Sequence, residues 1–196
     1  MTGENITIAI SGGIGSGKSV VSRMLSVMGY DVYDCDVNAR KLMDADSAIK
    51  AEIASDISPE VIIDGNIDRK RLAQIVFNDP LMLTRLNDIV HSAVRHHLTT
   101  YRTAHRGILF FESAILAESG FHTLADRVWE VIAPLDLRIE RVMRRNNLSR
   151  EEVEARIASQ SADSISTLHP AVDTIVNDDV MPLLTQVSNL LSRIGE

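Results

Sequence analysis

Residues 6–21, ITIAISGGIGSGKSVV, constrain the fold of this chain more than any other stretch. A short, continuous apolar run at 6–10 leads into a cluster of glycines, and an apolar pattern with helical spacing begins at Lys18. A run of this kind is typical of a strand that is buried on both faces of a parallel sheet. The sequence therefore predicts a strand, a glycine loop and a helix in direct succession, as at the opening of an α/β fold.

The same alternation of strand and helix patterns continues along the chain. Further buried-strand patterns occur at 30–34, 108–112, 127–133 and 173–177, and further helical patterns at 134–145, 149–160 and 180–194. Between Val37 and Arg106 we find helical spacing and no strand. The pattern predicts an α/β fold: a three-layer, doubly wound parallel sheet of about five strands with an inserted helical region and a helical lid.

We expect a single domain with three functional parts. The core would comprise residues 6–36, 106–136 and 172–196, the helical substrate-binding part residues 37–105, and the lid residues 137–165. Ser149 followed by Glu152 predicts a capping box at the start of one lid helix.

Composition excludes several classes of partner. The net charge of −7 disfavours nucleic acid and anionic membrane surfaces, which select basic proteins. No run approaches the roughly 20 apolar residues of a membrane span, and the chain starts without the basic segment of a signal peptide. The single cysteine, Cys35, excludes an internal disulfide. We therefore expect a cytoplasmic protein, either a monomer or a small homo-oligomer.

The glycine cluster matches the spacing G-x-x-x-x-G-K-[ST] of a phosphate-binding loop, from Gly12 to Ser19. In such a loop backbone N–H groups surround phosphates, the lysine reaches the β- and γ-phosphates and the hydroxyl ligates Mg²⁺. The alternative is a glycine-rich turn with an exposed lysine. The candidate nucleotide-binding residues are Gly13, Ile14, Gly15, Ser16, Gly17, Lys18, Ser19 and Val20, with ATP as the expected nucleotide.

A phosphate-binding loop does not by itself define the reaction. The D-x-x-G and N-K-x-D motifs of switch GTPases are absent, and transporter-type ATPases are longer than 196 residues. The size and layout favour a small-molecule kinase. A nucleoside, nucleotide or sugar-acid kinase and a regulatory protein that binds ATP without transferring phosphate remain alternatives.

Two carboxylates, Asp34 and Asp36, follow the second predicted strand. They would lie beside the glycine loop if the two strands are adjacent, and residues two apart on a strand face the same side. One would then accept a proton from an attacking hydroxyl and the other hold a metal's water molecules. Alternatively, both are turn formers or helix N-caps. Cys35, between two acids, is interpreted as an inert small side chain.

Three arginines, Arg138, Arg141 and Arg145, fall at i, i+3 and i+7 of a predicted helix and form one stripe. Such a stripe suits a lid that closes over phosphates and offsets their charge. The alternative is a solvated face whose arginines pair with Glu140 and Asp136.

Taken together, the motifs resemble one enzyme family over nearly the whole chain. GGIGSGKS, DCDVNAR, RLAQIVFNDP with LNDIVH, ESAILAESGF, the arginine helix ending near ASQ, and DTIVN are similar to the motifs of dephospho-CoA kinases, in the family's order. The resemblance implies transfer of the γ-phosphate of ATP, with Mg²⁺, to the ribose 3′-hydroxyl of dephospho-CoA, the last step of coenzyme A synthesis.

The resemblance also implies roles for individual residues. Asp36 matches the family's catalytic base, and Asp34, Arg40 and His91 lie in its substrate-side motifs. The catalytic residues would be Lys18, Asp36 and Arg141, with Arg145 and Asn177 toward ATP and Ser19 on Mg²⁺.

Three positions depart from the family pattern. Ser92 follows His91 where proline is usual, so the helix should continue without a break. Glu112 stands where aspartate is usual. Either it or Asp34 would reach Mg²⁺ through water; alternatively, Glu112 holds a lid residue or merely ends its strand. The segment 161–173 lacks the basic residues that are common there.

Overall fold

The computed structural model describes residues 5–160 and 165–194. The chain forms two compact units. One comprises Met1–Asp34 and His105–Glu196, and the other comprises Cys35–Ala104.

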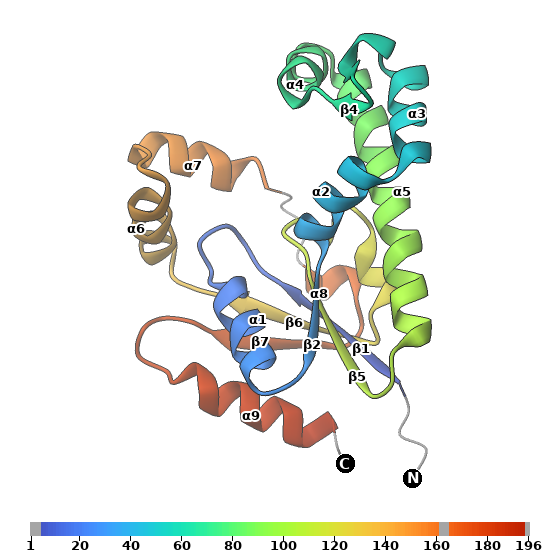
Figure 1. The fold of residues 1–196 in the computed structure, drawn as a ribbon. Helices are drawn as coiled ribbons and strands as arrows, with labels where there is room; N and C mark the ends of the chain where they lie inside the picture. The colour runs from blue at the N-terminus through green and yellow to red at the C-terminus, as the bar shows by residue number, and fades with distance from the viewer. Residues whose placement is uncertain (1–4, 161–164, 195–196) are drawn as a thin grey trace. The chain divides into compact units, whose positions relative to one another are not determined.

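The first unit contains a parallel sheet with strand order β2-β5-β1-β6-β7 (Figure 1). Its strands are β1 (Ile6–Ser11), β2 (Asp31–Asp34), β5 (Ile108–Glu112), β6 (Arg127–Ile132) and β7 (Val172–Val176). Its helices are α1 (Lys18–Val27), η2 (Phe121–Leu124), α6 (Leu135–Asn146), α7 (Arg150–Ala158), α8 (Ile165–Leu168) and α9 (Leu183–Ile194). This confirms the predicted five-stranded, parallel α/β fold.

The strand order corrects one expectation about the site. The second strand does not lie beside the first, because β5 occupies the position between β1 and β2. A crossover connection brings the next strand back into the same sheet, but it does not fix how many strand positions lie between the two strands. The order of strands along the chain therefore does not show which strands are neighbours in the sheet. Asp34 is therefore in register with Glu112 of β5.

One face of this sheet is covered by α1 and α9. Val21 and Leu25 of α1 and Val187 of α9 join a fully buried cluster with strand residues such as Trp129. The rings of Trp129 and Phe110 lie 5.1 Å apart between centroids. Burial of this cluster holds the carboxyl ends of β1, β5 and β6 in a fixed arrangement, on which the site is built.

The second unit is mostly helical. Its elements are α2 (Cys35–Ala45), α3 (Ser47–Asp56), η1 (Pro59–Val61), β3 (Ile62–Ile63), β4 (Asn66–Ile67), α4 (Arg69–Asn78) and α5 (Pro80–Ala104). Its core includes Ile53, Val61 and Ile89. As predicted, α5 runs through Ser92 without a break over 25 residues.

The expectation of no strand in this part of the chain is wrong. β3 and β4 form an antiparallel hairpin joined by Asp64 and Gly65. Both turn residues have positive φ, 50° and 74°, as a type I′ turn requires. The Asp-Gly pair was a hairpin signal, but each strand has only two residues, too few for an alternating pattern to stand out.

Within the part of the chain that the structure describes, no helix has both the length and the apolar character to cross a bilayer.

Candidate functional site

The glycine loop joins β1 to α1, and its conformation depends on glycine at two positions in particular. Gly12 has φ +142°, and a Cβ there would overlap the carbonyl oxygen of Val131. Gly17 has φ +100°, and a Cβ there would overlap the side-chain amide of Asn177. The loop is therefore held close to its neighbours in a conformation that L side chains rarely adopt.

The N-terminus of α1 differs from those of α3 and α7. Gly17 at its N-cap offers no side-chain hydrogen bond, and its first turn contains no acidic residue. By contrast, Asp46 caps α3, and Ser149 forms with Glu152 the predicted capping box of α7. No side-chain oxygen therefore caps the positive dipole end of α1, and such a helix N-terminus suits an anion.

Lys18 lies in the first turn of α1 and is buried, with 9% of its surface exposed. Its Nζ donates hydrogen bonds to the carbonyl oxygens of Gly12 at 2.6 Å and Gly13 at 3.4 Å. The ammonium group is therefore held at the loop itself. The adjacent Ser19 and Val20 are exposed in the same turn.

Asp34 and Glu112 end neighbouring parallel strands and are in register. Both are half-buried. Among the described residues no group of three or more His, Cys, Asp or Glu is placed to hold a metal. Mg²⁺ commonly takes only one or two carboxylates together with substrate phosphates, so this pair and the Ser19 hydroxyl fit it as oxygen donors.

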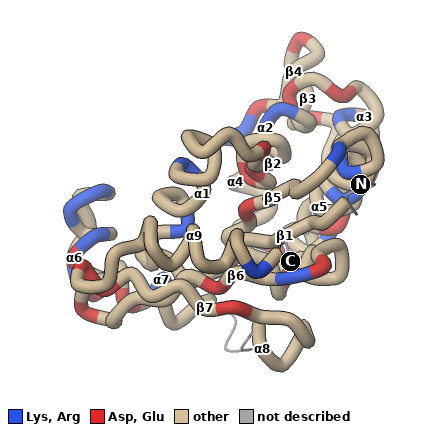
Figure 2. Tube along the Cα trace, turned by 90° about the horizontal axis from the view of Figure 1, so that it is seen from below, with Lys and Arg blue, Asp and Glu red and all other residues tan. Residues whose placement is uncertain are grey.

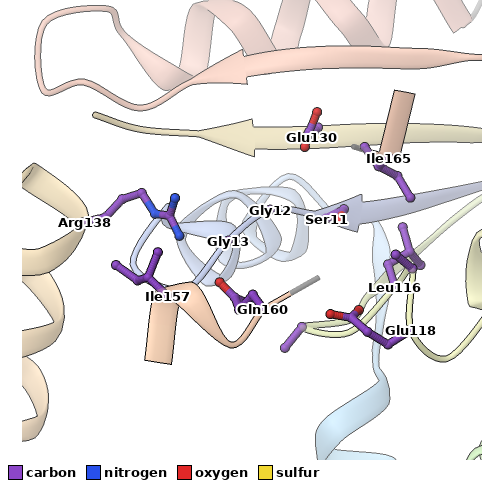
Figure 3. A pocket seen from close by; sticks show the side chains of 12 residues that line it. Ser11, Gly12, Gly13, Leu116, Glu118, Glu130, Arg138, Ile157, Gln160 and Ile165 are labelled. Carbon is purple, nitrogen blue, oxygen red and sulfur yellow. The ribbon is translucent and has the colours of Figure 1, made fainter. Parts of the chain in front are cut away.

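Two side chains from the second half of the chain hold the tip of the loop. The backbone N–H of Ile14 donates to Oε1 of Gln160 at 2.7 Å. The carbonyl oxygen of Ile14 accepts from Nε of Arg138 at 2.9 Å. Figure 3 shows Arg138 reaching from its helix toward Gly13, with Gln160 beside the loop. Burial lowers the pKa of the Arg138 guanidinium, but the group remains charged.

Asn177 follows β7 and holds the base of the loop. Its buried side chain donates from Nδ2 to the carbonyl oxygen of Ser16 at 2.7 Å. Arg141 donates to the backbone oxygen of Asn177 at 3.1 Å and to its Oδ1 at 3.3 Å, and forms an ion pair with Asp179 at 2.6 Å. The structure thus brings Arg141 to Asn177, which in turn contacts the loop.

The three arginines of the α6 stripe have different neighbours, although basic residues gather on α6 (Figure 2). Arg145 is exposed and donates to the side chain of Asn146 at 2.9 Å. Asp136, which we considered as a partner of the stripe, pairs instead with Arg150 at 2.6 Å. Arg138 and Arg141 are therefore the members of the stripe that contact other parts of the first unit.

Asp36, Arg40 and His91 belong to the second unit. Asp36 is exposed in the first turn of α2, so the argument that it shares a strand face with Asp34 is wrong: the strand ends at Asp34. Arg40 is exposed on the same helix. His91 is half-buried on α5, and burial lowers the pKa of its imidazole.

A cavity of about 190 Å³ lies beside the loop (Figure 3). Its lining includes Gly13, Glu118, Glu130, Arg138 and Gln160. Burial raises the pKa of the Glu130 carboxyl. Sequence reasoning missed Glu130, although a charged residue inside the buried-strand pattern RVWEVIA was a detectable signal. It also missed the contact of Gln160 with the loop, for which a single sequence gives no signal.

Comparison with known proteins agrees with this geometry. The family model for dephospho-CoA kinase matches residues 6–182. A dephospho-CoA kinase from Bacteroides fragilis is 39% identical over 190 residues, covering 95% of this chain and 92% of that protein. One from Porphyromonas gingivalis is 36% identical over 190 residues, covering 96% and 94%. A crystal structure from Thermus thermophilus has a TM-score of 0.76 and 33% identity, covering 97% of this chain and 96% of that chain. Since the matches span nearly the whole sequence, the chain belongs to the dephospho-CoA kinase family.

Proposed function

We propose that this chain transfers the γ-phosphoryl group of ATP to the ribose 3′-hydroxyl of dephospho-CoA, giving coenzyme A and ADP. The observation that carries the proposal is the uncapped N-terminus of α1, preceded by a glycine loop and containing Lys18. Membership of the dephospho-CoA kinase family supports the choice of reaction and acceptor over other small-molecule kinases.

In this proposal the loop binds the triphosphate of ATP. Backbone N–H groups between Gly15 and Ser19 surround the phosphates, while the N–H of Ile14 stays bonded to Gln160. Lys18 moves its ammonium from the loop carbonyls to the β- and γ-phosphates. Because the helix end carries no acidic residue, it adds no repulsion to the bound anion. The local positive charge gives specific binding despite the net charge of −7.

We propose that Asp36 is the catalytic base. Its carboxylate orients the 3′-hydroxyl and takes its proton as the new bond forms between the 3′-oxygen and the γ-phosphorus. The bond from that phosphorus to the bridging oxygen breaks, and ADP leaves with the electron pair. Because this transition state is loose, positioning matters more than the strength of the base.

The remaining acceptor and metal roles follow the family motifs. Asp34 at the end of β2 binds the acceptor together with Arg40 and His91, which lie in the substrate-binding part at residues 37–105. Ser19 ligates Mg²⁺, with Asp34 or Glu112 acting through water. When bound, Mg²⁺ neutralises part of the triphosphate charge.

We assign the arginines and Asn177 to the nucleotide side. Arg141 offsets charge on the transferred group and Arg145 approaches ATP, within a lid formed by residues 137–165, of which 161–164 lie outside the described residues. Asn177 also lies on the nucleotide side, and its hydrogen bond to the carbonyl oxygen of Ser16 in the loop supports this assignment. We also propose a cytoplasmic location and a monomer or small homo-oligomer; the single, buried Cys35 is consistent with a reducing compartment.

An acceptor panel tests the function. ADP release is measured by a coupled assay with ATP, Mg²⁺ and, in turn, dephospho-CoA, nucleosides, nucleotides and sugar acids. We expect rapid ADP formation with dephospho-CoA and slow formation with the others. Equal rates with and without dephospho-CoA would instead indicate a protein that binds ATP without this transfer.

A further inference from the structure

Ile14 lies at the tip of the glycine loop. Residues of α6, α7 and the segment just after α7 contact its N–H group, its carbonyl oxygen and its side chain. Gln160 binds its N–H and Arg138 binds its carbonyl oxygen, at 2.7 and 2.9 Å. Its side chain packs against the apolar cluster of the helix pair, formed by Ile139, Val142 and Val153.

We propose that Gln160 is a positioning residue for nucleotide binding, which it promotes by fixing the backbone of Ile14 and thereby the shape of the phosphate-binding loop. The proposal rests on the proposed function only in so far as the loop binds the phosphates of a nucleotide. It assigns to Gln160 no contact with substrate.

The physical need for such a contact comes from the loop itself. Ile14 lies between Gly13 and Gly15, and Gly15 has φ +78°. Glycines on both sides allow many backbone conformations, most of which point the following amides away from a common centre. A loop that is already fixed in the binding conformation avoids that ordering cost when the nucleotide binds.

Substituting Gln160 tests how fixing the loop affects nucleotide binding without changing the charge of the site. Arg138 also holds Ile14, but removing it deletes a positive charge close to the phosphates. Gln160 is neutral, so loss of its side-chain acceptor changes the hydrogen bond without changing the charge. Gln160 lies two residues after the end of α7, so the contact links the helix pair α6–α7 to the loop.

The test measures binding of MgADP to the full-length chain by calorimetry. Gln160→Leu keeps a side chain of similar size and removes the acceptor. We expect the Kd for MgADP to rise about tenfold, the effect of losing one hydrogen bond of ordinary strength. In turnover assays KM for ATP should rise while KM for dephospho-CoA stays the same.

Asp126→Ala is the control for general destabilisation. Oδ2 of Asp126 accepts the backbone N–H of Thr7 at 2.7 Å, so the variant removes a part-buried side-chain acceptor of a backbone N–H at the other end of β1. It should lower the Tm and leave the Kd for MgADP unchanged. A second variant, Ile14→Ala, keeps both backbone bonds and removes the apolar anchor, and should also weaken MgADP binding.

The proposal is overturned if Gln160→Leu and Ile14→Ala bind MgADP as tightly as the wild type, whatever their Tm. It is also overturned if Asp126→Ala weakens binding as much as Gln160→Leu, since the effect would then be general destabilisation. Because MgADP binding needs no acceptor, these outcomes are independent of whether dephospho-CoA is the substrate.

Discussion

At the scale of single residues, Lys18 is the side chain whose removal should be most specific to catalysis. Lys18→Met keeps the length of the side chain and deletes the ammonium that is held at the loop. We expect kcat to fall by about 100-fold or more, because charge developing on the transferred group loses a cation that is held at the loop. Steady-state kinetics on the variant and on Lys70→Met, an exposed control on α4, check this; wild-type kcat for Lys18→Met would contradict it.

Asp36 is tested by a change that keeps its shape. Asp36→Asn removes the proton acceptor and should lower kcat by about 100-fold or more, the usual contribution of a positioned base. Asp44→Asn is a control on the same helix, where the carboxylate pairs with Arg69 on the surface. Turnover at the wild-type rate in Asp36→Asn would remove the assignment of the base.

Glu130 gives a pH-dependent prediction about stability. Burial raises the pKa of its carboxyl above the ordinary value of 4.5. Between these two pKa values the folded chain keeps a proton that the unfolded chain has released, so stability falls as pH rises through that window. Above the raised pKa the folded state therefore carries the whole penalty of a half-buried charge.

Glu130→Gln removes that penalty and should have a higher Tm than the wild type at pH 7. The difference should shrink as the pH falls toward and below 4.5, because the wild-type carboxyl is then protonated in both states. Thermal unfolding across this pH range checks the prediction, with Glu140→Gln on the surface of α6 as control for the lost charge. A difference that is independent of pH would contradict it.

At the scale of elements, the β3–β4 hairpin depends on its turn. Gly65 has φ +74° and no neighbour within 4 Å of an added Cβ, so Gly65→Ala should cost only the backbone strain, about 1 kcal/mol. We expect the Tm to fall by about 2–4 °C. Asp64→Gly, at φ +50°, relieves strain and should not lower the Tm. An equal fall in Tm for Gly65→Ala and Asp64→Gly would contradict the prediction that the stability of the hairpin depends on its turn conformation.

The elements also show which kinds of structure a single sequence predicts well. The capping box at Ser149 and the continuous helix through Ser92 are local features, fixed by residues a few positions apart, and both were predicted correctly. The place of β2 in the sheet depends on which strands pair across the fold, which local spacing does not specify. The hairpin lies between these cases, because its turn signal was present but its strands were too short.

At the scale of the whole molecule, the same distinction applies to the site. The phosphate-binding loop was predictable because all its chemistry lies between Gly12 and Val20 in one contiguous motif. The contact between Ile14 and Gln160 joins residues 146 positions apart, so no local pattern in a single sequence predicts it. The register of Asp34 with Glu112 likewise emerges only when the sheet is assembled.

The central claim is that this chain phosphorylates dephospho-CoA on its ribose. Its most direct test is to incubate the protein with ATP, Mg²⁺ and dephospho-CoA and to analyse the product by mass spectrometry and ³¹P NMR. We predict the gain of one phosphoryl group, as a monoester on the 3′-oxygen, in equal amount to the ADP formed. ADP without phosphorylated acceptor, or phosphate at another position, would contradict it.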